Sequence, residues 1–306
     1  MSTVSTSTSA FFERARRDMT SLRMEAESIQ TQISTQNRLS KSSDDPVAAS
    51  RLRSLSRLER LSDIDVANAN RANADLALTD STLTDLADYI TRATELALQA
   101  SNETLTVGQR AAIGKEMEGI SDNLFVLSNA RDTNGHALFG GESSAEAYQL
   151  DASGNAVYVG TANAGELPLG EGQTVSRGLT GPEFLNFSVN GTPTNLMAVF
   201  KTLSDAMQGG VADPAGAARS TLDALAAGLE SVTTNQTVVG SRLAWIELTT
   251  ERRVNLSESR VGEQADIGGT DIATAVANLQ ETLTVLEASQ ASFSKLMGLS
   301  LFDLLR

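Results

Sequence analysis

The chain has 306 residues, 41% of them hydrophobic, which is enough apolar mass for a sizeable core and for two domains. Aromatic residues make up only 4%, and the formal net charge is −14. Such a negative charge argues against nucleic-acid binding, which needs a positive surface. The absence of Cys excludes disulfides and Cys-ligated metals, and a Ser-His triad or multi-His metal site would have to converge on the single histidine, His136.

The sequence shows no targeting or membrane segment. Residues 1–9 are rich in Ser and Thr, and the longest apolar run near them covers only residues 10–12, unlike the apolar core of a signal peptide. No stretch approaches the roughly 18 consecutive apolar residues of a membrane span. We therefore expect no membrane insertion, and composition alone favours a cytosolic protein.

The first predicted element is a long helix near the N-terminus. Its apolar residues recur in alternating steps of three and four, which gives the 3.5-residue period of a coiled-coil seam. The seam positions are Phe12, Ala15, Met19, Leu22, Ala26, Ile29 and Ile33. We take the five side chains larger than Ala as candidate assembly residues, because so narrow an apolar stripe leaves a long helix dependent on neighbours.

A turn and two further helices follow. Asp45 is placed as the N-cap of a helix whose first residue is Pro46, since Pro suits the first helical position. Asp44 precedes the cap, so a turn and a cap explain this pair of carboxylates without a catalytic role. A second capping signal, Thr106 with Gln109 three residues later, predicts the start of the next helix.

Charge is unevenly distributed along the chain. Residues 1–60 carry ten basic and seven acidic side chains, a net charge of +3, so the remaining residues carry −17. Arg53, Arg57 and Arg60 follow at steps of four and three, which puts them on one stripe of the predicted helix. The stripe is either a solvated face or an inter-subunit contact that meets an acidic surface of a neighbour.

The pattern changes between residues 132 and 193. Turn signals such as the Asn-Gly pair at 134–135 are frequent there, and residues 149–150 and 157–159 are typical of short strands. We expect a small β-rich insert, with His136 as an exposed turn residue. Gly170 and Gly172 do not begin a dinucleotide-binding fingerprint, because neither a helix nor a third Gly follows at the right spacing.

Helices return after the insert. One is predicted near residues 196–207, and a longer one carries the seam Leu222, Leu225, Leu229, Val232, Gln236, Val239, Leu243 and Ile246. The last predicted helix repeats the steps of three and four. Its candidate assembly residues are Ile272, Val276, Leu279, Leu283, Leu286, Phe293 and Met297.

Together these elements predict a mainly α fold: long N- and C-terminal helices that pair as a coiled-coil-like core, a helical-bundle middle and a small β-rich insert domain. The expected divisions are a core helix and turn at 1–45, the first half of a helical domain at 46–131, the insert at 132–193, the returning half at 194–265 and a second core helix at 266–306. No acid, base and nucleophile cluster in the sequence, so we expect neither enzymatic activity nor a cofactor.

Several motifs resemble the flagellin superfamily, in which N- and C-terminal helices pair as the inner core of a tubular polymer. The turn at 43–49, Ser-Asp-Asp-Pro-Val-Ala-Ala, is similar to the family's turn between its first two helices. Residues 134–141 are similar to the segment that leads into the outer domain. Pro46, where filament flagellins usually have Ala, and the ending Ser-Leu-Phe-Asp-Leu-Leu at 300–305 are typical of hook-associated members.

The resemblance implies a structural subunit of the bacterial flagellum at the junction between hook and filament. It implies a ring-like homo-oligomer, with an adjacent hook-associated protein on one side and flagellin on the other. It also implies an extracellular location, reached through the flagellar export apparatus without a cleaved signal peptide and with an export chaperone. Candidate chaperone contacts are Phe293, Met297, Leu301 and Phe302; the alternative is that these residues form only the polymer seam.

We further hypothesise that residues 1–40 and 270–306 are mobile in the monomer and become ordered only between adjacent subunits. Two other functions remain open. A filament flagellin would share the same structural class. A soluble coiled-coil adhesin or signalling module would instead have ordered termini in solution.

Overall fold

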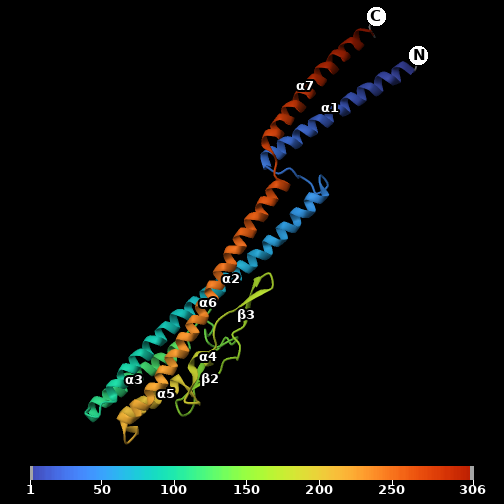
Figure 1. Cartoon of the computed structure of the whole chain (residues 1–306). Helices are drawn as coiled ribbons and strands as arrows, with labels where there is room; N and C mark the ends of the chain where they lie inside the picture. Colours follow the sequence, from blue (N-terminus) through green and yellow to red (C-terminus); the bar gives the residue numbers. More distant parts are fainter. Residues whose placement is uncertain (1–2, 304–306) are drawn as a thin grey trace. The chain divides into compact units, whose positions relative to one another are not determined.

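The computed structural model describes the backbone of residues 3–303 and the side chains of residues 10–297. It confirms a mainly α fold, in which long helices are accompanied by short antiparallel hairpins (Figure 1). Contacts within the chain divide it into two units. Unit 1 consists of residues 1–60 and 256–306, and unit 2 consists of residues 61–255.

Helices account for most of the described chain. They are α1 (Thr3–Thr35), α2 (Pro46–Ala100), α3 (Val107–Ser128), α4 (Gly181–Leu185), α5 (Leu196–Asp205), α6 (Pro214–Gly268) and α7 (Ile272–Asp303). The π-helical turn η1 (Ala206–Gly210) continues α5, so the helix predicted near 196–207 changes its hydrogen bonding after Asp205. Over the described residues, none of these helices is both long enough and apolar enough to cross a membrane.

Two helices start with the predicted capping chemistry. Asp45 accepts a hydrogen bond from the backbone amide of Ala48 at 3.0 Å, so it caps α2. At the start of α3, the Thr106 amide donates to Gln109 Oε1 at 2.9 Å, and the Gln109 amide donates to Thr106 Oγ1 at 3.3 Å. These side chains satisfy amides that the first helical turn leaves without a partner.

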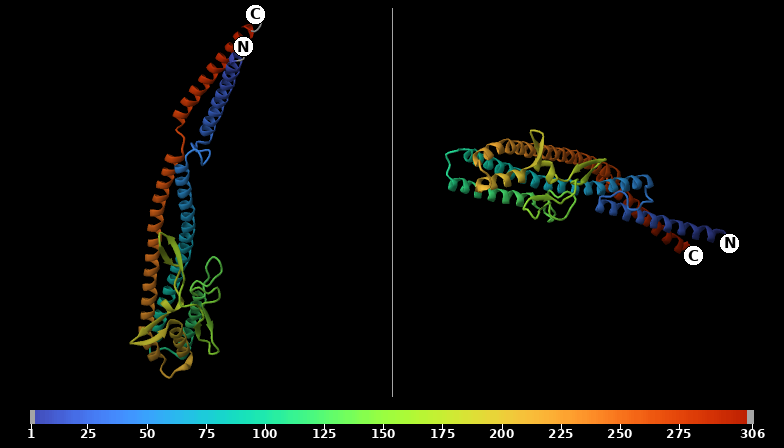
Figure 2. Two further views of the ribbon diagram at one scale, coloured as in Figure 1. Left: turned by 90° about the vertical axis from the view of Figure 1, so that its right-hand side faces the viewer. Right: turned by 90° about the horizontal axis from the view of Figure 1, so that it is seen from below.

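Unit 1 contains α1, α7 and the adjoining ends of α2 and α6. The helices α1 and α7 run antiparallel and lie side by side (Figures 1 and 2), and the rings of Phe12 and Phe293 meet edge to face with centroids 5.5 Å apart. Within the described residues, the buried apolar side chains of unit 1 are Ala26, Ala48, Ala49, Leu55, Ala275 and Leu286. Most of them are Ala, so unit 1 has a small core.

Unit 2 contains the main hydrophobic core, where α2 packs with α3, α5 and α6. Its completely buried side chains include Leu76, Leu83, Leu86 and Ile90 of α2, Met117 and Leu124 of α3, and Phe200 of α5. The predicted α6 seam is confirmed, because Leu225, Val232 and Val239 are also completely buried. Phe139 and Phe184 of the insert join this core, with ring centroids 4.8 Å apart.

The insert consists, in the described chain, of three separate hairpins. Their strands are β1 (Tyr148–Leu150), β2 (Ala156–Tyr158), β3 (Glu166–Gly170), β4 (Gln173–Ser176), β5 (Asn186–Val189) and β6 (Thr192–Asn195). Each strand pairs antiparallel with the next, as β1 with β2, β3 with β4 and β5 with β6. Because an isolated two-stranded hairpin is marginally stable, the hairpins depend on packing against the helices.

Candidate functional site in the terminal helices

The candidate assembly residues of α1 form the side of the helix that lies against α7. Phe12, Met19, Leu22, Ile29 and Ile33 are all half-buried, whereas the positions between them are mostly exposed. Ala26 lies in the same stripe and is 7% exposed. The 3.5-residue period therefore follows the side of α1 that meets its partner helix.

The candidate assembly residues of α7 divide into two sets. Leu279 and Phe293 are half-buried on the side of α1, and Leu286 is buried there. The other four, Ile272, Val276, Leu283 and Met297, have exposed fractions between 38% and 46%. We call these four residues the open stripe, because no described part of the chain covers them.

Small residues explain why the open stripe stays uncovered. The side of α7 that meets α1 includes Ala275 and Thr282, which are 7% and 9% exposed. These two positions directly precede Val276 and Leu283, so α7 meets α1 with Ala275 and Thr282 in place of those two predicted seam residues. Side chains as small as Ala let two helices approach closely, and the larger apolar residues beside them are left facing outward.

The turn before α2 is held by its two carboxylates. Asp44 Oδ2 accepts hydrogen bonds from the backbone amides of Lys41, at 2.8 Å, and Ser40, at 3.2 Å. The Lys41 bond is the main cause of a pKa for Asp44 below the ordinary value of 3.8. The pKa of Asp45 is also lowered, first by the amide that it caps and then by the side chain of Arg38. Asp44, Asp45 and Pro46 of the predicted turn motif thus form a hydrogen-bonded turn and the start of α2.

The same turn is joined to the connection between α6 and α7. The Arg38 amide donates to Gly268 O at 2.8 Å, and the Arg38 guanidinium donates to Ile267 O at 3.0 Å. In the opposite direction, the Thr270 amide donates to Gln36 O at 3.0 Å. These hydrogen bonds therefore join the two chain segments of unit 1 just after the end of α1 and just before the start of α7. No local sequence signal pointed to these contacts of Arg38, because Ile267 and Gly268 lie more than 200 residues away from it.

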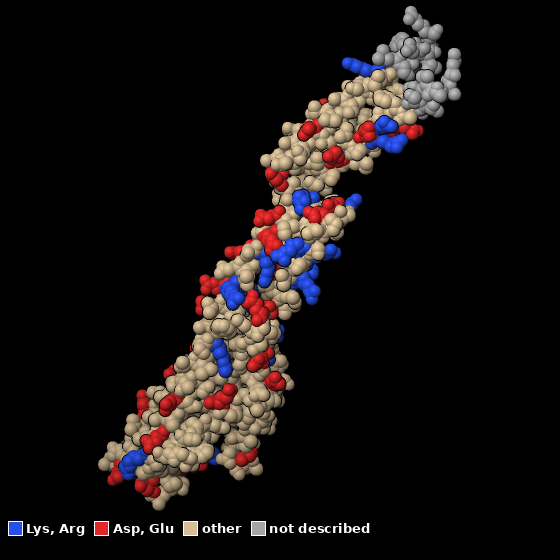
Figure 3. All heavy atoms as spheres, turned by 45° about the vertical axis from the view of Figure 1, so that its right-hand side comes forward, with Lys and Arg blue, Asp and Glu red and all other residues tan. Residues whose placement is uncertain are grey.

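The arginine stripe, defined as Arg53, Arg57 and Arg60, is exposed on α2. None of the three forms an ion pair with a residue that the structure describes, whereas nearby Arg51 pairs with both carboxylate oxygens of Glu263 at 2.5 and 2.8 Å. On the face in Figure 3, several basic side chains lie close together, with acidic side chains among them and over the rest of the face. The charge of the stripe is available to a neighbour.

The candidate chaperone contacts lie at the end of α7. Phe293 is half-buried beside Phe12, and Met297 is 44% exposed. The side chains of Leu301 and Phe302 lie outside the described residues. A chaperone contact and a polymer seam both remain predictions for this segment.

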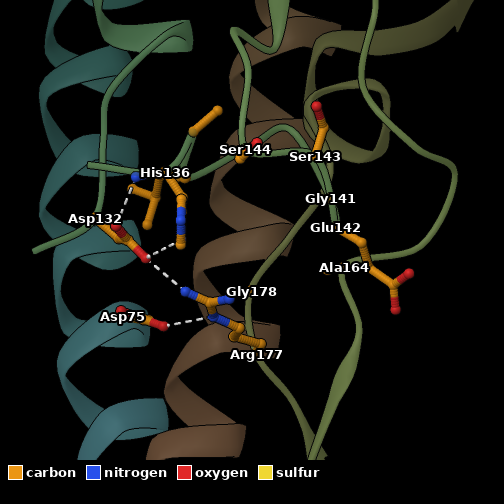
Figure 4. Close-up of a pocket in the computed structure, with 12 residues that line it drawn as sticks. Asp75, Asp132, His136, Gly141, Glu142, Ser143, Ser144, Ala164, Arg177 and Gly178 are labelled. Carbon is orange, nitrogen blue, oxygen red and sulfur yellow. Dashed lines mark hydrogen bonds and ion pairs between the residues drawn. The ribbon is translucent and has the colours of Figure 1, made fainter. Parts of the chain in front are cut away.

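A polar cluster in unit 2 was not predicted from the sequence. Arg177, which follows β4, donates from Nε to Asp75 Oδ2 at 2.9 Å and from Nη2 to Asp132 Oδ2 at 2.5 Å (Figure 4). Both carboxylates are buried, with exposed fractions of 4% and 3%. Burial raises the pKa of Asp132, but hydrogen bonds from the His136 and Asn134 amides and the charge of Arg177 outweigh this effect and lower it.

This cluster is a structural cross-link between α2, the start of the insert and the end of β4. It borders a cavity of about 220 Å³ that His136, Glu142 and Ser143 also line. His136 has a side chain 49% exposed, with Nδ1 3.7 Å from Asp132 Oδ2, as suits a turn residue. Within the described part of the chain, no three His, Cys, Asp or Glu side chains are grouped to hold a metal ion.

A comparison with protein families indicates the class of protein that this chain resembles. The family described as the bacterial flagellin N-terminal helical region matches residues 4–144, a segment that contains α2, α3 and nearly all of α1. The matched segment therefore includes the carboxylate turn and most of α1, and it is similar to the corresponding region of flagellins. This is the class that the sequence motifs predicted.

The longer matches identify the particular relatives. The chain is 26% identical to flagellar hook-associated protein 3 of Escherichia coli K12 over 314 residues, which covers 97% of this chain and 98% of that protein. The structure of a flagellar hook-associated protein from Vibrio parahaemolyticus shares its fold, with a TM-score of 0.68, 21% identity and coverage of 74% of this chain and 100% of the other. Similarity to flagellin A of Vibrio cholerae, at 23% identity, spans 52% of this chain. The predicted resemblance to hook-associated members is confirmed.

Proposed function

We propose that the chain is a structural subunit of the bacterial flagellum that forms the junction between hook and filament. Similarity to hook-associated protein 3 along nearly the whole of both chains supports this function. The match to a flagellin covers only 52% of this chain and 42% of that flagellin, which favours a junction protein over a filament subunit. The protein works by assembling, without catalysing a reaction.

The observation that carries the proposal is the open stripe of α7. A helix that packs against one partner needs one apolar seam, but α7 has a second apolar stripe beside the seam that α1 occupies. Burying such a stripe is favourable by about 25 cal/mol per Å² of apolar surface. In a ring-like homo-oligomer, a terminal helix of the neighbouring subunit supplies the missing partner.

The small core of unit 1 supports the same reading. With mostly Ala buried, the α1–α7 pair gains little from packing inside one subunit. Burial of the open stripe against a neighbour adds the missing free energy, so folding of the terminal helices is coupled to assembly. A chain whose ends stay unfolded until capture is also suited to passage through the flagellar export apparatus and assembly outside the cell.

Several partners follow from this function. The proposed neighbours are other copies of the chain, an adjacent hook-associated protein and flagellin, and an export chaperone binds the C-terminal end before assembly. Truncation after residue 292 removes Phe293, Met297, Leu301 and Phe302 together. If the truncated chain still co-purifies with its chaperone, those four residues are not the chaperone contact.

Deletion of the gene tests the function. Loss of a junction protein leaves hooks without filaments and releases flagellin into the medium, whereas loss of the filament flagellin leaves capped hooks. Electron microscopy of the deletion cells, with secreted flagellin assayed in parallel, separates the two outcomes. Normal filaments on the deletion cells would contradict both functions.

A further inference from the structure

A groove between α2 and α3 in unit 2 combines apolar and acidic side chains. Ile120, which is 6% exposed, and Leu127 line it together with the ring of Tyr89. Asp85, Asp88 and Glu116 line the same groove, whose volume is about 560 Å³. The lining thus offers an apolar floor and a negative rim.

The negative charge of this groove is not neutralised by its own basic residue. Arg92 lies in the groove, but it already pairs with Glu95 at 2.9 Å and with Glu116 at 2.7 Å. Asp85 and Asp88 are exposed and form neither an ion pair nor a side-chain hydrogen bond within the described residues. The four ionised side chains that line the groove, Asp85, Asp88, Glu116 and Arg92, carry a net charge of −2.

Arginine is the side chain that this arrangement fits best. A guanidinium presents a planar fork of N–H donors, and Asp85 and Asp88 offer unpaired carboxylate oxygens to it. Tyr89 offers an aromatic ring for a cation–π contact, which operates within about 6 Å. The methylene groups of the arginine can lie along Ile120 and Leu127 while the charged end reaches the rim. A helix with two arginines one turn apart would satisfy both aspartates.

The chain itself carries that pattern. We propose that the groove of one copy binds the arginine stripe of a second copy. Arg57 and Arg60 are three residues apart, as are Asp85 and Asp88, so each pair advances about 4.5 Å along its helix. The stripe, with Arg53, carries a charge of +3, opposite in sign to the −2 of the groove lining. Leu58, which is 40% exposed, lies between the arginines in sequence and adds an apolar side chain at the edge of the contact.

This inference rests on the proposed function, because it names one contact by which a junction subunit meets its neighbour. The contact joins two different surfaces of identical chains, so it repeats from copy to copy into a closed ring or a helical array. Charge complementarity of this kind guides association and selects the register of neighbours. It is therefore weakened by salt while the subunits are assembling.

Cross-linking tests the contact directly, because the chain has no Cys of its own. A size-tagged copy with Arg57→Cys and an untagged copy with Asp88→Cys are expressed with excess wild-type chain, so that incorporation does not depend on the substituted side chains. Purified flagella are then treated with a short bismaleimide. Since packed helices lie about 8–10 Å apart, we expect a cross-linked heterodimer. Asp85→Cys in place of Asp88→Cys covers the opposite helix direction.

The matched control replaces Asp88→Cys with Glu247→Cys, at an exposed position on α6. We expect the heterodimer to exceed this control several-fold for one of the two aspartate positions. No excess at either position overturns the contact, and so does a cross-link from Arg57→Cys to a different flagellar protein. If the wild-type chain is itself absent from purified flagella, the proposed function fails and the contact fails with it. If the chain is present in purified flagella but no heterodimer forms, the contact alone is refuted.

Discussion

Single carboxylates hold the helix starts that meet in unit 1. Asp45 caps α2, and Asp271 caps α7 by accepting from the amides of Ala273 at 3.0 Å and Thr274 at 3.3 Å. Each lies where a helix N-terminus presents unpaired amides, so its negative charge is favourable there. Asp44 organises the turn itself. The residues that make the turn similar to flagellins therefore have a structural role that follows from their hydrogen bonds.

The same carboxylates predict a dependence on pH. Asp44, Asp45 and Asp271 all have a pKa lowered from 3.8, the last chiefly by the Thr274 hydroxyl. Because each pKa is lower in the folded than in the unfolded chain, their contribution to stability is complete above about pH 4 and is lost as the pH falls through the folded pKa. Solid-state carboxyl ¹³C NMR of the assembled protein, in which α1 and α7 are ordered, should give titration midpoints below 3.8 for all three.

One substitution tests the cause of the lowered pKa of Asp271. Thr274→Val removes the hydroxyl that donates to Asp271 Oδ2 at 2.7 Å, so the Asp271 midpoint should rise while the Asp44 midpoint stays. An unchanged Asp271 midpoint in the variant would show that the hydrogen bond from the Thr274 hydroxyl does not lower the pKa of Asp271.

The Arg177 cluster gives a second prediction at the residue scale. Arg177→Met leaves two buried carboxylates, Asp75 and Asp132, without a cation. Removing one partner from a buried ion pair costs 3–5 kcal/mol, and we expect about 3 because the Arg177 side chain is 32% exposed. Urea unfolding followed by the fluorescence of Trp245, the single tryptophan, measures the stability of unit 2.

Neutralising both acids is the control for this variant. Adding Asp75→Asn and Asp132→Asn to Arg177→Met should recover most of the lost stability, because the uncompensated charges are then gone. A triple variant as unstable as the single one would mean that the arginine contributes through packing instead.

At the scale of elements, apolar spacing and capping residues predicted most helices. The 3.5-residue apolar period predicted α1, and the seam from Leu222 to Ile246 predicted α6. The capping box of Thr106 and Gln109 predicted the start of α3. These signals work because they act over one or two helical turns. The same period could not show which of two adjacent stripes of α7 meets α1, since that depends on how closely the helices approach at Ala275 and Thr282.

Long-range polar contacts were beyond the reach of sequence patterns. Arg177 meets Asp75 across 102 residues and Asp132 across 45. Arg38 meets Ile267 across 229. No spacing rule links positions so far apart, because the tertiary fold alone brings them together. The spacing of Arg53, Arg57 and Arg60 did predict an exposed stripe on one face of α2, because three arginines on one helix face are costly to bury.

The open stripe makes a prediction at the scale of the element. Leu283→Gln changes a side chain that is 42% exposed, so the stability of the monomer should stay within about 0.5 kcal/mol of wild type. Incorporation into flagella should fall, because the neighbour then meets a polar group. Thermal melting of the monomer and the amount of chain in purified flagella measure the two effects. Glu287→Gln, an exposed change on the same helix, is the control and should incorporate normally.

If Leu283→Gln and Glu287→Gln lose incorporation equally, α7 tolerates no polar change and the loss is not specific to the open stripe. If Leu283→Gln incorporates normally, the open stripe is not an assembly surface. Leu286→Gln provides the contrast. Leu286 is 8% exposed on the side of α1, so this change should disturb the helix pair itself.

For the whole molecule, the two units differ in how much they bury. The buried cluster of unit 2 draws on residues from Ala69 to Ile246 and includes large side chains such as Phe139, Phe184 and Phe200. Unit 1 buries mostly Ala within its described residues. Unit 2 is therefore expected to fold in the free subunit, whereas unit 1 gains its remaining stabilisation from other copies. This division is the physical basis of the proposed coupling, in which unit 2 is folded in the free subunit and the terminal helices become ordered on assembly.

Hydrogen exchange, compared between the purified monomer and assembled flagella, tests this coupling most directly. In the monomer, amides of residues 12–33 and 272–297 should exchange rapidly, while the buried α6 segment 222–246 stays protected and serves as the internal reference. In assembled flagella, both terminal segments should become protected. Strong protection of residues 12–33 in the monomer would contradict the account, because the terminal helices would then be stable without neighbours.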